Sequence, residues 1–223
     1  MVEENMTQLD EFVKYQQDLL KNYQYLNKIA TKGQVLFTGS SLMEQFPIVE
    51  LAMIYGLNIK VHNRGVGGFT TSQFLENIET MALDLEPTTL FINIGTNDIQ
   101  DQAGQLSWQV TLENNYREIL RQIKAALPTA KVYVMAYYPM DETHPILKYW
   151  QGFSRTNAKI AEANQIAENL AHEFGYHFIN VNAGLADETG NLYRHFTKDG
   201  IHIYAKAYDV VYRNLLPYLQ RSL

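Results

Sequence analysis

The sequence predicts one α/β domain in which helices cover both faces of a parallel sheet. Short apolar runs typical of strands alternate along the chain with longer segments of helical periodicity, and no linker rich in Pro, Gly or Ser divides the 223 residues. We therefore expect a single domain over residues 1–223, with an N-terminal helical extension at about residues 7–30.

Composition narrows the class of protein. The chain is 46% hydrophobic and 19% charged, which can fill a sizeable core, and no apolar stretch approaches the ~20 residues of a membrane span. The acidic start at residues 1–5 lacks the pattern of a secretory signal, so a cytoplasmic location is expected. A net charge of −6 has the wrong sign for phosphate backbones, so nucleic acid is not an expected partner. A homo-oligomer is compatible with the sequence but has no support in it.

Five strands are predicted, each by a short apolar or alternating run. The run at 90–94 is almost continuously apolar, as in a strand buried on both faces, whereas the run at 59–62 alternates apolar and polar residues. The strands are expected at residues 35–37, 59–62, 90–94, 132–136 and 176–181.

Apolar residues at spacings of three and four predict the helices. Thr7 and Asp10 can cap the start of the first helix, Gly175 is expected to end the fourth, and Pro217 is expected to kink or end the last. The helices are expected at about residues 7–30, 74–85, 112–127, 160–174 and 204–219.

Polar residues gather where three of the predicted strands end. These clusters are 38–41, 63–68 and 95–98. Ligands of parallel α/β sheets bind at the carboxyl ends of the strands, near the switch in strand order. We therefore expect the three clusters to converge on one site.

Ser41 is a candidate nucleophile in the first cluster. A helix beginning at Leu42 would place the Ser41 hydroxyl at a helix N-terminus, where backbone N–H groups favour developing negative charge. The alternative is that Ser41 and Glu44 form a capping box with no catalytic meaning. Ser41 alone does not separate the two readings.

A serine nucleophile needs a base, and the base needs a partner that orients it. Two pairs of the form Asp-x-x-His occur, Asp199 with His202 and Asp141 with His144, and spacing does not choose between them. The remaining histidines are interpreted as structural or solvated: His62, His172, His177 and His195.

Two further residues can hold the oxyanion of an acyl-transfer reaction. Gly68 offers an unobstructed backbone N–H and Asn97 a side-chain amide, although both residue types are also common in turns. An aromatic group is a candidate wall for an acyl or sugar pocket, or else core: Tyr137, Tyr138, Tyr149, Trp150 and Phe153.

No cofactor is expected. Residues 65–70 lack the final glycine of a dinucleotide fingerprint, and no phosphate-binding Gly-Lys-Ser/Thr loop or His-Glu-x-x-His metal motif occurs. The absence of cysteine excludes disulfides, thiolate chemistry and zinc sites built on cysteine.

In order along the chain, four motifs resemble those of the SGNH (GDSL-like) hydrolases, in particular the platelet-activating-factor acetylhydrolase-like branch. The four motifs, which span the chain from about residue 34 onward, are residues 37–42, 63–70, 95–98 and 199–202. The resemblance implies that Ser41 is the nucleophile, that His202 is its base and that Asp199 orients the base, which selects this pair over the other. It also implies an oxyanion hole made by Ser41, Gly68 and Asn97.

The same resemblance implies a flavodoxin-like three-layer αβα sandwich with strand order 2-1-3-4-5. The implied function is serine-dependent hydrolysis of a small-molecule ester through an acyl-enzyme intermediate. A short-chain or acetyl ester is expected, and acetylated carbohydrates, lysophospholipids and thioesters are the alternatives that the sequence leaves open. One departure is that Gly39-Ser40-Ser41 stands where the family has Gly-Asp-Ser. The alternative function is a non-catalytic domain that binds a small carbohydrate or lipid on the same fold.

Overall fold

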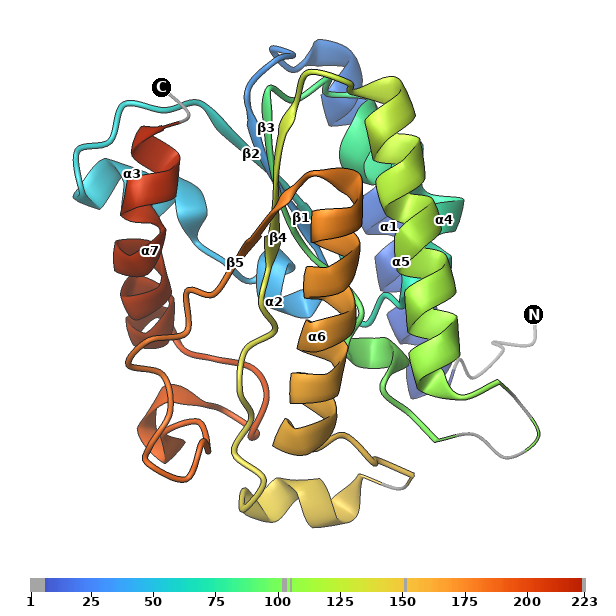
Figure 1. Ribbon diagram of the computed structural model, residues 1–223, viewed down its shortest axis with the longest axis vertical. Coiled ribbons are helices and arrows are strands. Elements are labelled where there is room, and N and C mark those ends of the chain that lie inside the picture. Colours follow the sequence, from blue (N-terminus) through green and yellow to red (C-terminus); the bar gives the residue numbers. More distant parts are fainter. Residues whose placement is uncertain (1–6, 102–103, 105, 151, 222–223) are drawn as a thin grey trace, which may run out of the picture.

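A five-stranded parallel sheet forms the centre of the computed structural model, which describes residues 7–101, 104, 106–150 and 152–221. The strand order is β2-β1-β3-β4-β5, which confirms the predicted fold class and topology (Figure 1). The strands are β1 (Val35–Gly39), β2 (Val61–Gly65), β3 (Thr89–Asn93), β4 (Lys131–Met135) and β5 (His177–Ile179).

Helices cover both faces of this sheet. The core on one face is built with α4, α5 and α6, and α1 packs against it; the core on the other face is built with α2, α3 and α7 (Figure 1). The helices are α1 (Gln8–Ile29), α2 (Ser41–Glu44), α3 (Ile48–Ile54), α4 (Thr71–Glu76), α5 (Trp108–Ala126), α6 (Asn157–Phe174) and α7 (Ala205–Gln220). Shorter turns are η1 (Glu79–Leu83), η2 (Thr96–Asp98), η3 (Pro145–Tyr149) and η4 (Arg194–Phe196).

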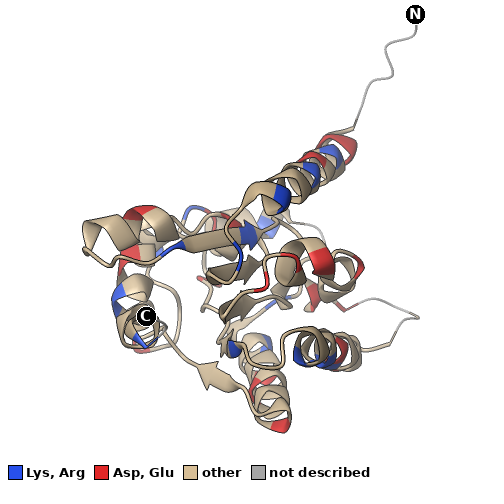
Figure 2. Ribbon diagram, turned by 90° about the horizontal axis from the view of Figure 1, so that it is seen from above, with Lys and Arg blue, Asp and Glu red and all other residues tan. Residues whose placement is uncertain are grey.

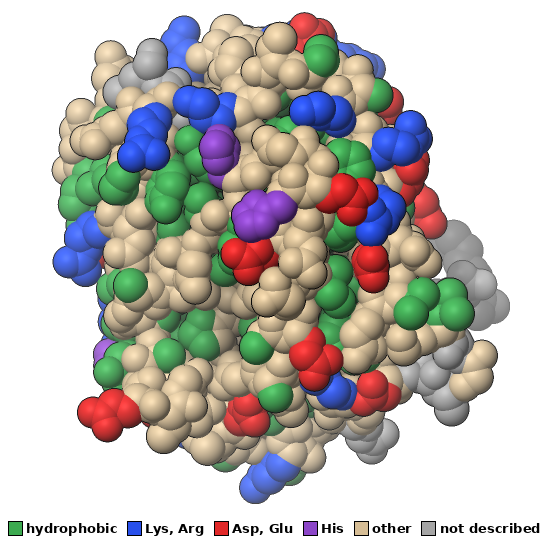
Figure 3. All heavy atoms as spheres, in the orientation of Figure 1, with side chains coloured by type: hydrophobic (Ala, Val, Ile, Leu, Met, Phe, Trp, Pro, Cys, Tyr) green, Lys and Arg blue, Asp and Glu red, His purple; other side chains and the backbone are tan. Residues whose placement is uncertain are grey.

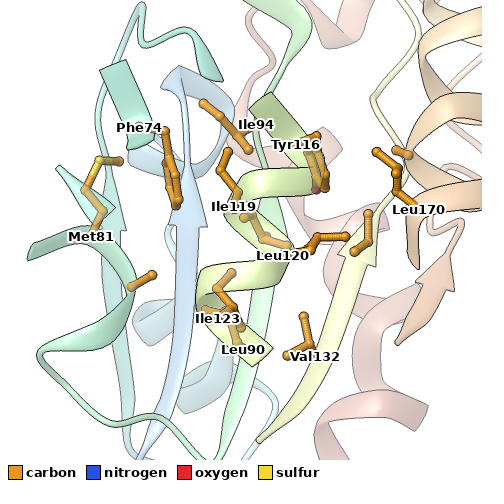
Figure 4. Packing of buried hydrophobic residues seen from close by; sticks show 14 of the residues in the cluster. Phe74, Met81, Leu90, Ile94, Tyr116, Ile119, Leu120, Ile123, Val132 and Leu170 are labelled. Atoms are coloured by element: carbon orange, nitrogen blue, oxygen red, sulfur yellow. The ribbon is translucent and has the colours of Figure 1, made fainter. Parts of the chain in front are cut away.

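Alternate residues of the central strands enter different cores, which explains their continuous apolar runs. Leu90 and Val132 pack beneath α5 and α6 (Figure 4). Phe91 points to the opposite face, where its ring stacks between Phe37 at 4.5 Å and Tyr133 at 4.8 Å. The two cores fix the sheet from both sides, and this rigid sheet carries the candidate site at its edge.

Several predicted elements differ from the structure. The helix expected at 74–85 is divided into α4 and the π turn η1, and α3 was not predicted. Pro217 lies inside α7 and does not end it: it removes one backbone hydrogen bond, while the fully buried Leu219 beyond it keeps the last turn packed on the core. Strand β5 is also shorter than expected.

Lys and Arg residues and Asp and Glu residues both occur along the helices (Figure 2). On the face drawn in Figure 3, positive and negative side chains are interspersed among apolar and neutral ones. That face therefore offers no broad positive surface to a polyanion.

Candidate active site

Ser41 stands on a tight turn between β1 and α2. Gly39 has φ +149°, and a Cβ at this position would lie 1.9 Å from the backbone oxygen of Asn93, so only glycine fits. The chain then turns into α2, with Ser40 as N-cap and Ser41 as the first helical residue. Ser41 is only half-buried, and because it begins α2 directly after β1, its hydroxyl lies at the carboxyl end of that strand.

The side chains of Ser41, His202 and Asp199 form a continuous hydrogen-bonded chain. The Nε2 atom of His202 lies 2.9 Å from the Oγ atom of Ser41, and its Nδ1 atom lies 2.7 Å from the Oδ2 atom of Asp199. The other carboxylate oxygen, Oδ1, accepts hydrogen bonds from the backbone N–H groups of Ile201 at 2.9 Å and His202 at 2.8 Å. Residues 161 positions apart in the sequence are therefore within hydrogen-bond reach.

The second Asp-x-x-His pair is not assembled in this way. Asp141 is buried and forms an ion pair with Arg194, while the Nδ1 atom of His144 accepts a hydrogen bond of 3.4 Å from the backbone of Ile146. This segment instead supports the loop of the first pair, since the backbone N–H of Asp141 donates to the carbonyl oxygen of Gly200 at 2.8 Å.

The Asp199 carboxyl is held in its ionised form. Partial burial alone would raise its pKa, but hydrogen bonds from the His202 ring and from the backbone N–H groups of His202 and Ile201 outweigh burial and lower the pKa to about 2. A permanently charged carboxylate on Nδ1 keeps the proton of the neutral imidazole on that nitrogen and leaves Nε2 free to accept one.

The same shift predicts an acid-sensitive contribution of Asp199 to stability. Its carboxyl pKa is 3.8 when unperturbed and about 2 in the fold, so the stabilisation is present above about pH 4 and is lost as the pH falls through about 2. We expect Asp199→Asn to lower the free energy of unfolding at neutral pH, and this deficit to shrink as the pH is lowered from about 4 toward 2. Urea unfolding of both proteins across this pH range measures it. A deficit that does not change with pH would contradict the prediction.

Gly68 and Asn97 lie on the same cavity as Ser41 and His202. In the part of the chain that the structure describes, neither the Ser41 nor the Gly68 backbone N–H donates to a protein acceptor. The Nδ2 atom of Asn97 donates to the Phe69 carbonyl at 3.0 Å, and this uses only one of its two hydrogens. Three hydrogen-bond donors are thus available beside the Ser41 hydroxyl.

Arg155 was not predicted as a site residue. It is buried, lines the cavity, and donates from Nη2 to the Oδ1 atom of Asn97 at 3.0 Å, which fixes which end of that amide faces the site. Burial lowers its pKa to about 10, with Asp98 opposing the shift, so it carries a positive charge at neutral pH. The charge strengthens the donor character of the Asn97 amide from behind.

The capping-box alternative for Ser41 is wrong. Ser40 is the N-cap of α2, makes no side-chain capping bond, and has a buried hydroxyl without a partner among the described residues. The Glu44 carboxylate does not return to the start of α2. It accepts hydrogen bonds from the Gly67 backbone and from the Tyr15 hydroxyl, which links the first helix to the glycine loop.

Two cavities meet at the Ser41 hydroxyl, and both are lined by Ser41, Asn97 and His202. One has a volume of about 240 Å³ and includes Trp150 and Phe153 in its wall; the other has a volume of about 260 Å³ and includes Phe12 and Tyr15 from α1. The aromatic group suggested by the sequence is therefore divided. Two members line the site, Tyr149 is 71% exposed, and Tyr137 and Tyr138 are buried in the core.

Other features of the described residues concern membranes, metals and the remaining histidines. No helix in this part of the chain has the length and apolar character needed to cross a membrane. Within residues 7–101, 104, 106–150 and 152–221, no group of three or more His, Asp or Glu side chains is arranged to hold a metal ion. Of the other histidines, His62 bonds the Thr31 carbonyl at 2.9 Å and His177 stacks on Tyr133.

Comparisons with known proteins identify the family and the fold. Residues 50–210 match the profile of the GDSL-like Lipase/Acylhydrolase family. A solved structure from Streptococcus pneumonia, provisionally named a platelet activating factor, is 27% identical with a TM-score of 0.83, and the match covers 94% of this chain and 95% of that chain. A GDSL-like lipase from Bacteroides thetaiotaomicron VPI-5482 is 22% identical with a TM-score of 0.74, and 92% and 98% of the two chains are covered. Axe2, an acetylxylan esterase from Geobacillus stearothermophilus, is 17% identical with a TM-score of 0.64, and the match covers 85% of this chain and 95% of that chain.

A curated relative is N-acylneuraminate cytidylyltransferase from Escherichia coli O18:K1:H7 (strain RS218 / NMEC). It is 23% identical over 193 residues, which make up 83% of this chain. The chain spans 40% of the length of that enzyme. The similarity therefore concerns one part of it.

Proposed function

Since the chain belongs to the GDSL-like lipase/acylhydrolase family and is thus a hydrolase of carboxylic esters, we propose that it cleaves esters of short acyl groups through an acyl-enzyme intermediate on Ser41. The observation that carries this proposal is the hydrogen-bonded chain from the Ser41 hydroxyl through His202 to Asp199. It has the three parts that an activated serine requires: nucleophile, base and a group that orients the base.

In the first step the Oγ atom of Ser41 attacks the carbonyl carbon of the ester. A carbon–oxygen bond forms, the carbonyl electron pair moves onto the oxygen, and the hydroxyl proton passes to Nε2 of His202, 2.9 Å away. The bond to the alcohol then breaks, and the alcohol oxygen leaves with the proton from Nε2. The acyl group remains on Ser41 as an ester.

The negative oxygen of the tetrahedral intermediate needs donors already in place. The backbone N–H groups of Ser41 and Gly68 and the free hydrogen on the Asn97 amide supply them, and Arg155 adds positive charge behind Asn97. Asp199 stabilises the imidazolium cation that forms at the same moment. Both developing charges are thereby met by groups that do not need to reorganise.

Water completes the reaction. It gives one proton to Nε2 of His202 and attacks the acyl carbon, and the second tetrahedral intermediate uses the same three donors. The bond to Ser41 breaks, its oxygen recovers a proton from His202, and a carboxylic acid is released. The half-buried Ser41 and His202 leave this water a path to the site.

The size of the cavities favours short acyl groups. At about 240 and 260 Å³, each is smaller than the roughly 300 Å³ at which cavities for drug-sized ligands begin. With the scissile ester at Ser41, the acyl and alcohol parts extend into separate small cavities. A long acyl chain would leave most of its methylene groups in water.

This proposal predicts that kcat/KM stops increasing once the acyl group fills its cavity. With p-nitrophenyl esters we expect kcat/KM to reach its maximum between acetate and butyrate and to be no higher for decanoate, because a methylene group that stays in solvent gains none of the ~0.8 kcal/mol of burial. Initial rates across the series measure this, with the Ser41→Ala protein as background. A rate that rises with chain length would contradict the short-chain assignment without removing the esterase activity.

A further inference from the structure

Helix α1 lies outside the part of the chain that matches the family profile, yet it forms one wall of the site. Phe12 and Tyr15 line the cavity that contains Ser41. A Cβ added to Gly68 would come within 2.8 Å of the Phe12 ring and 3.0 Å of the Gln16 amide nitrogen, so the helix rests directly on the glycine loop. The site is therefore incomplete without α1.

The contact between α1 and this loop is largely polar. The Nε2 atom of Gln16 donates to the Gly67 carbonyl oxygen at 2.6 Å, the Tyr23 hydroxyl donates to the Gly65 carbonyl at 2.8 Å, and Arg64 donates to Asn27 at 2.8 Å. Gln16 is only 6% exposed, although most of α1 is open to solvent. Burying an amide costs free energy unless its hydrogen bonds are made, so the bond from Gln16 to the Gly67 carbonyl offsets the cost of burying this side chain.

The bond from Gln16 determines where the next N–H points. The carbonyl of Gly67 and the N–H of Gly68 belong to one planar trans peptide unit, so they point in opposite directions. Gln16 holds the carbonyl on the side of α1, which turns the Gly68 N–H to the other side. The preceding peptide unit, between Val66 and Gly67, is held as well, because the Gly67 N–H donates to the Glu44 carboxylate. Two glycines in sequence would otherwise leave this segment free to rotate.

We infer that Gln16 is a positioning residue of the oxyanion hole: it fixes the Gly67–Gly68 peptide so that the Gly68 N–H faces the reacting carbonyl, an inference that rests on the proposed role of Gly68. Gln16 is not among the residues that line either cavity at Ser41. Its contribution appears in the transition state, where the oxyanion forms, and not in ground-state binding.

The test compares Gln16→Met with two matched variants of the same helix. Methionine keeps the size of the side chain and removes the donor. Gln17→Met makes the same change at an exposed position, and Tyr23→Phe removes a different donor from α1 to the glycine loop. For p-nitrophenyl acetate we expect Gln16→Met to lower kcat by about 10- to 100-fold with KM within about twofold, because losing a complete donor typically costs 10²- to 10³-fold. The two matched variants should keep the wild-type kcat.

A tetrahedral mimic separates positioning from a purely structural role. A small alkylboronic acid that adds to Ser41 places an oxygen in the oxyanion hole, so its affinity should fall in Gln16→Met by the same factor as kcat/KM, whereas the product acetate should bind as to wild type. Melting temperatures of all three variants report any general loosening of α1. If Gln16→Met is poorly folded, Gln16→Ala and the boronic acid affinity of the folded fraction provide the comparison.

The outcomes distinguish this inference from the proposed function. Wild-type kcat in Gln16→Met, or equal losses in Gln16→Met and Tyr23→Phe, would overturn the role of Gln16 and leave the esterase intact. A wild-type protein that hydrolyses none of the esters would overturn the proposed function itself.

Discussion

Replacing Ser41 with alanine is expected to lower kcat for a short-chain ester by on the order of 10⁴- to 10⁶-fold, to near the background rate. The hydroxyl oxygen is the atom that forms the acyl-enzyme, and the His202 imidazole 2.9 Å away has nothing else to deprotonate in this route. The fold should be unaffected, because the Ser41 side chain is half-exposed and its hydroxyl bonds His202 and makes no capping bond to α2. Initial rates with p-nitrophenyl acetate, together with circular dichroism spectra, measure both.

Ser40→Ala is the matched control. It removes a neighbouring hydroxyl that is buried and unpartnered among the described residues, so activity and stability should stay close to wild type.

Combining Ser41→Ala with His202→Ala should lower kcat no further than Ser41→Ala alone, since the two side chains act as a unit. If the protein were a non-catalytic binding domain, neither the wild type nor Ser41→Ala would hydrolyse the ester. Substantial turnover in Ser41→Ala would mean that another group attacks the ester.

Much of the fold was predictable because most elements carry a local pattern. Helix α1 begins at the capping box that Thr7 and Asp10 suggest, and α6 ends at Gly175 in the left-handed conformation that a glycine adopts there. The apolar run of β3 is continuous because its alternate residues enter the two cores. Short-range spacing was sufficient for these elements.

The elements that differed depend on tertiary packing. Helix α3 has seven residues, too few for a clear period, and is held by burial of Ile48 and Leu51. The segment at 74–85 keeps its helical spacing, but the backbone departs from an α-helix at Asn77 and continues as the π turn η1. Spacing of apolar residues does not distinguish one helix from two successive turns.

The site was predictable only in part. Spacing gave two Asp-x-x-His pairs, and the resemblance to a family selected the one that lies beside Ser41. Gln16 and Arg155 were missed because they bond to a backbone carbonyl and to another side chain across the fold, and such contacts leave no pattern of residue types in the sequence. The polar clusters at strand ends were informative because topology alone brings them together.

Asp199→Asn is expected to lower kcat by roughly 10³- to 10⁴-fold, through the tautomer of His202 and not through loss of the loop. In the native protein Oδ1 of Asp199 accepts two backbone N–H bonds, from Ile201 at 2.9 Å and from His202 at 2.8 Å. An asparagine must keep its oxygen at that position, because its NH₂ group cannot accept them. The NH₂ group is then forced to face Nδ1 of the imidazole.

That orientation reverses the proton pattern of the ring. An NH₂ donor facing Nδ1 requires Nδ1 to be the acceptor, so the proton of the neutral imidazole moves to Nε2. Nε2 then presents a hydrogen to the Ser41 hydroxyl, from which it should instead take one. Nitrogen NMR of the labelled ring reports the tautomer directly: Nδ1–H in wild type and Nε2–H in the variant.

His144→Ala is the control, since it removes the imidazole of the rival pair while keeping the Cβ that packs 2.9 Å from the position a Gly200 Cβ would take. Its activity should stay within about threefold of wild type, as expected for a residue away from the reacting atoms. If Asp199→Asn kept more than about a tenth of the wild-type kcat, or if its His202 proton remained on Nδ1, the two backbone bonds would not determine the orientation of the amide. Asp199 would then act only as a nearby charge.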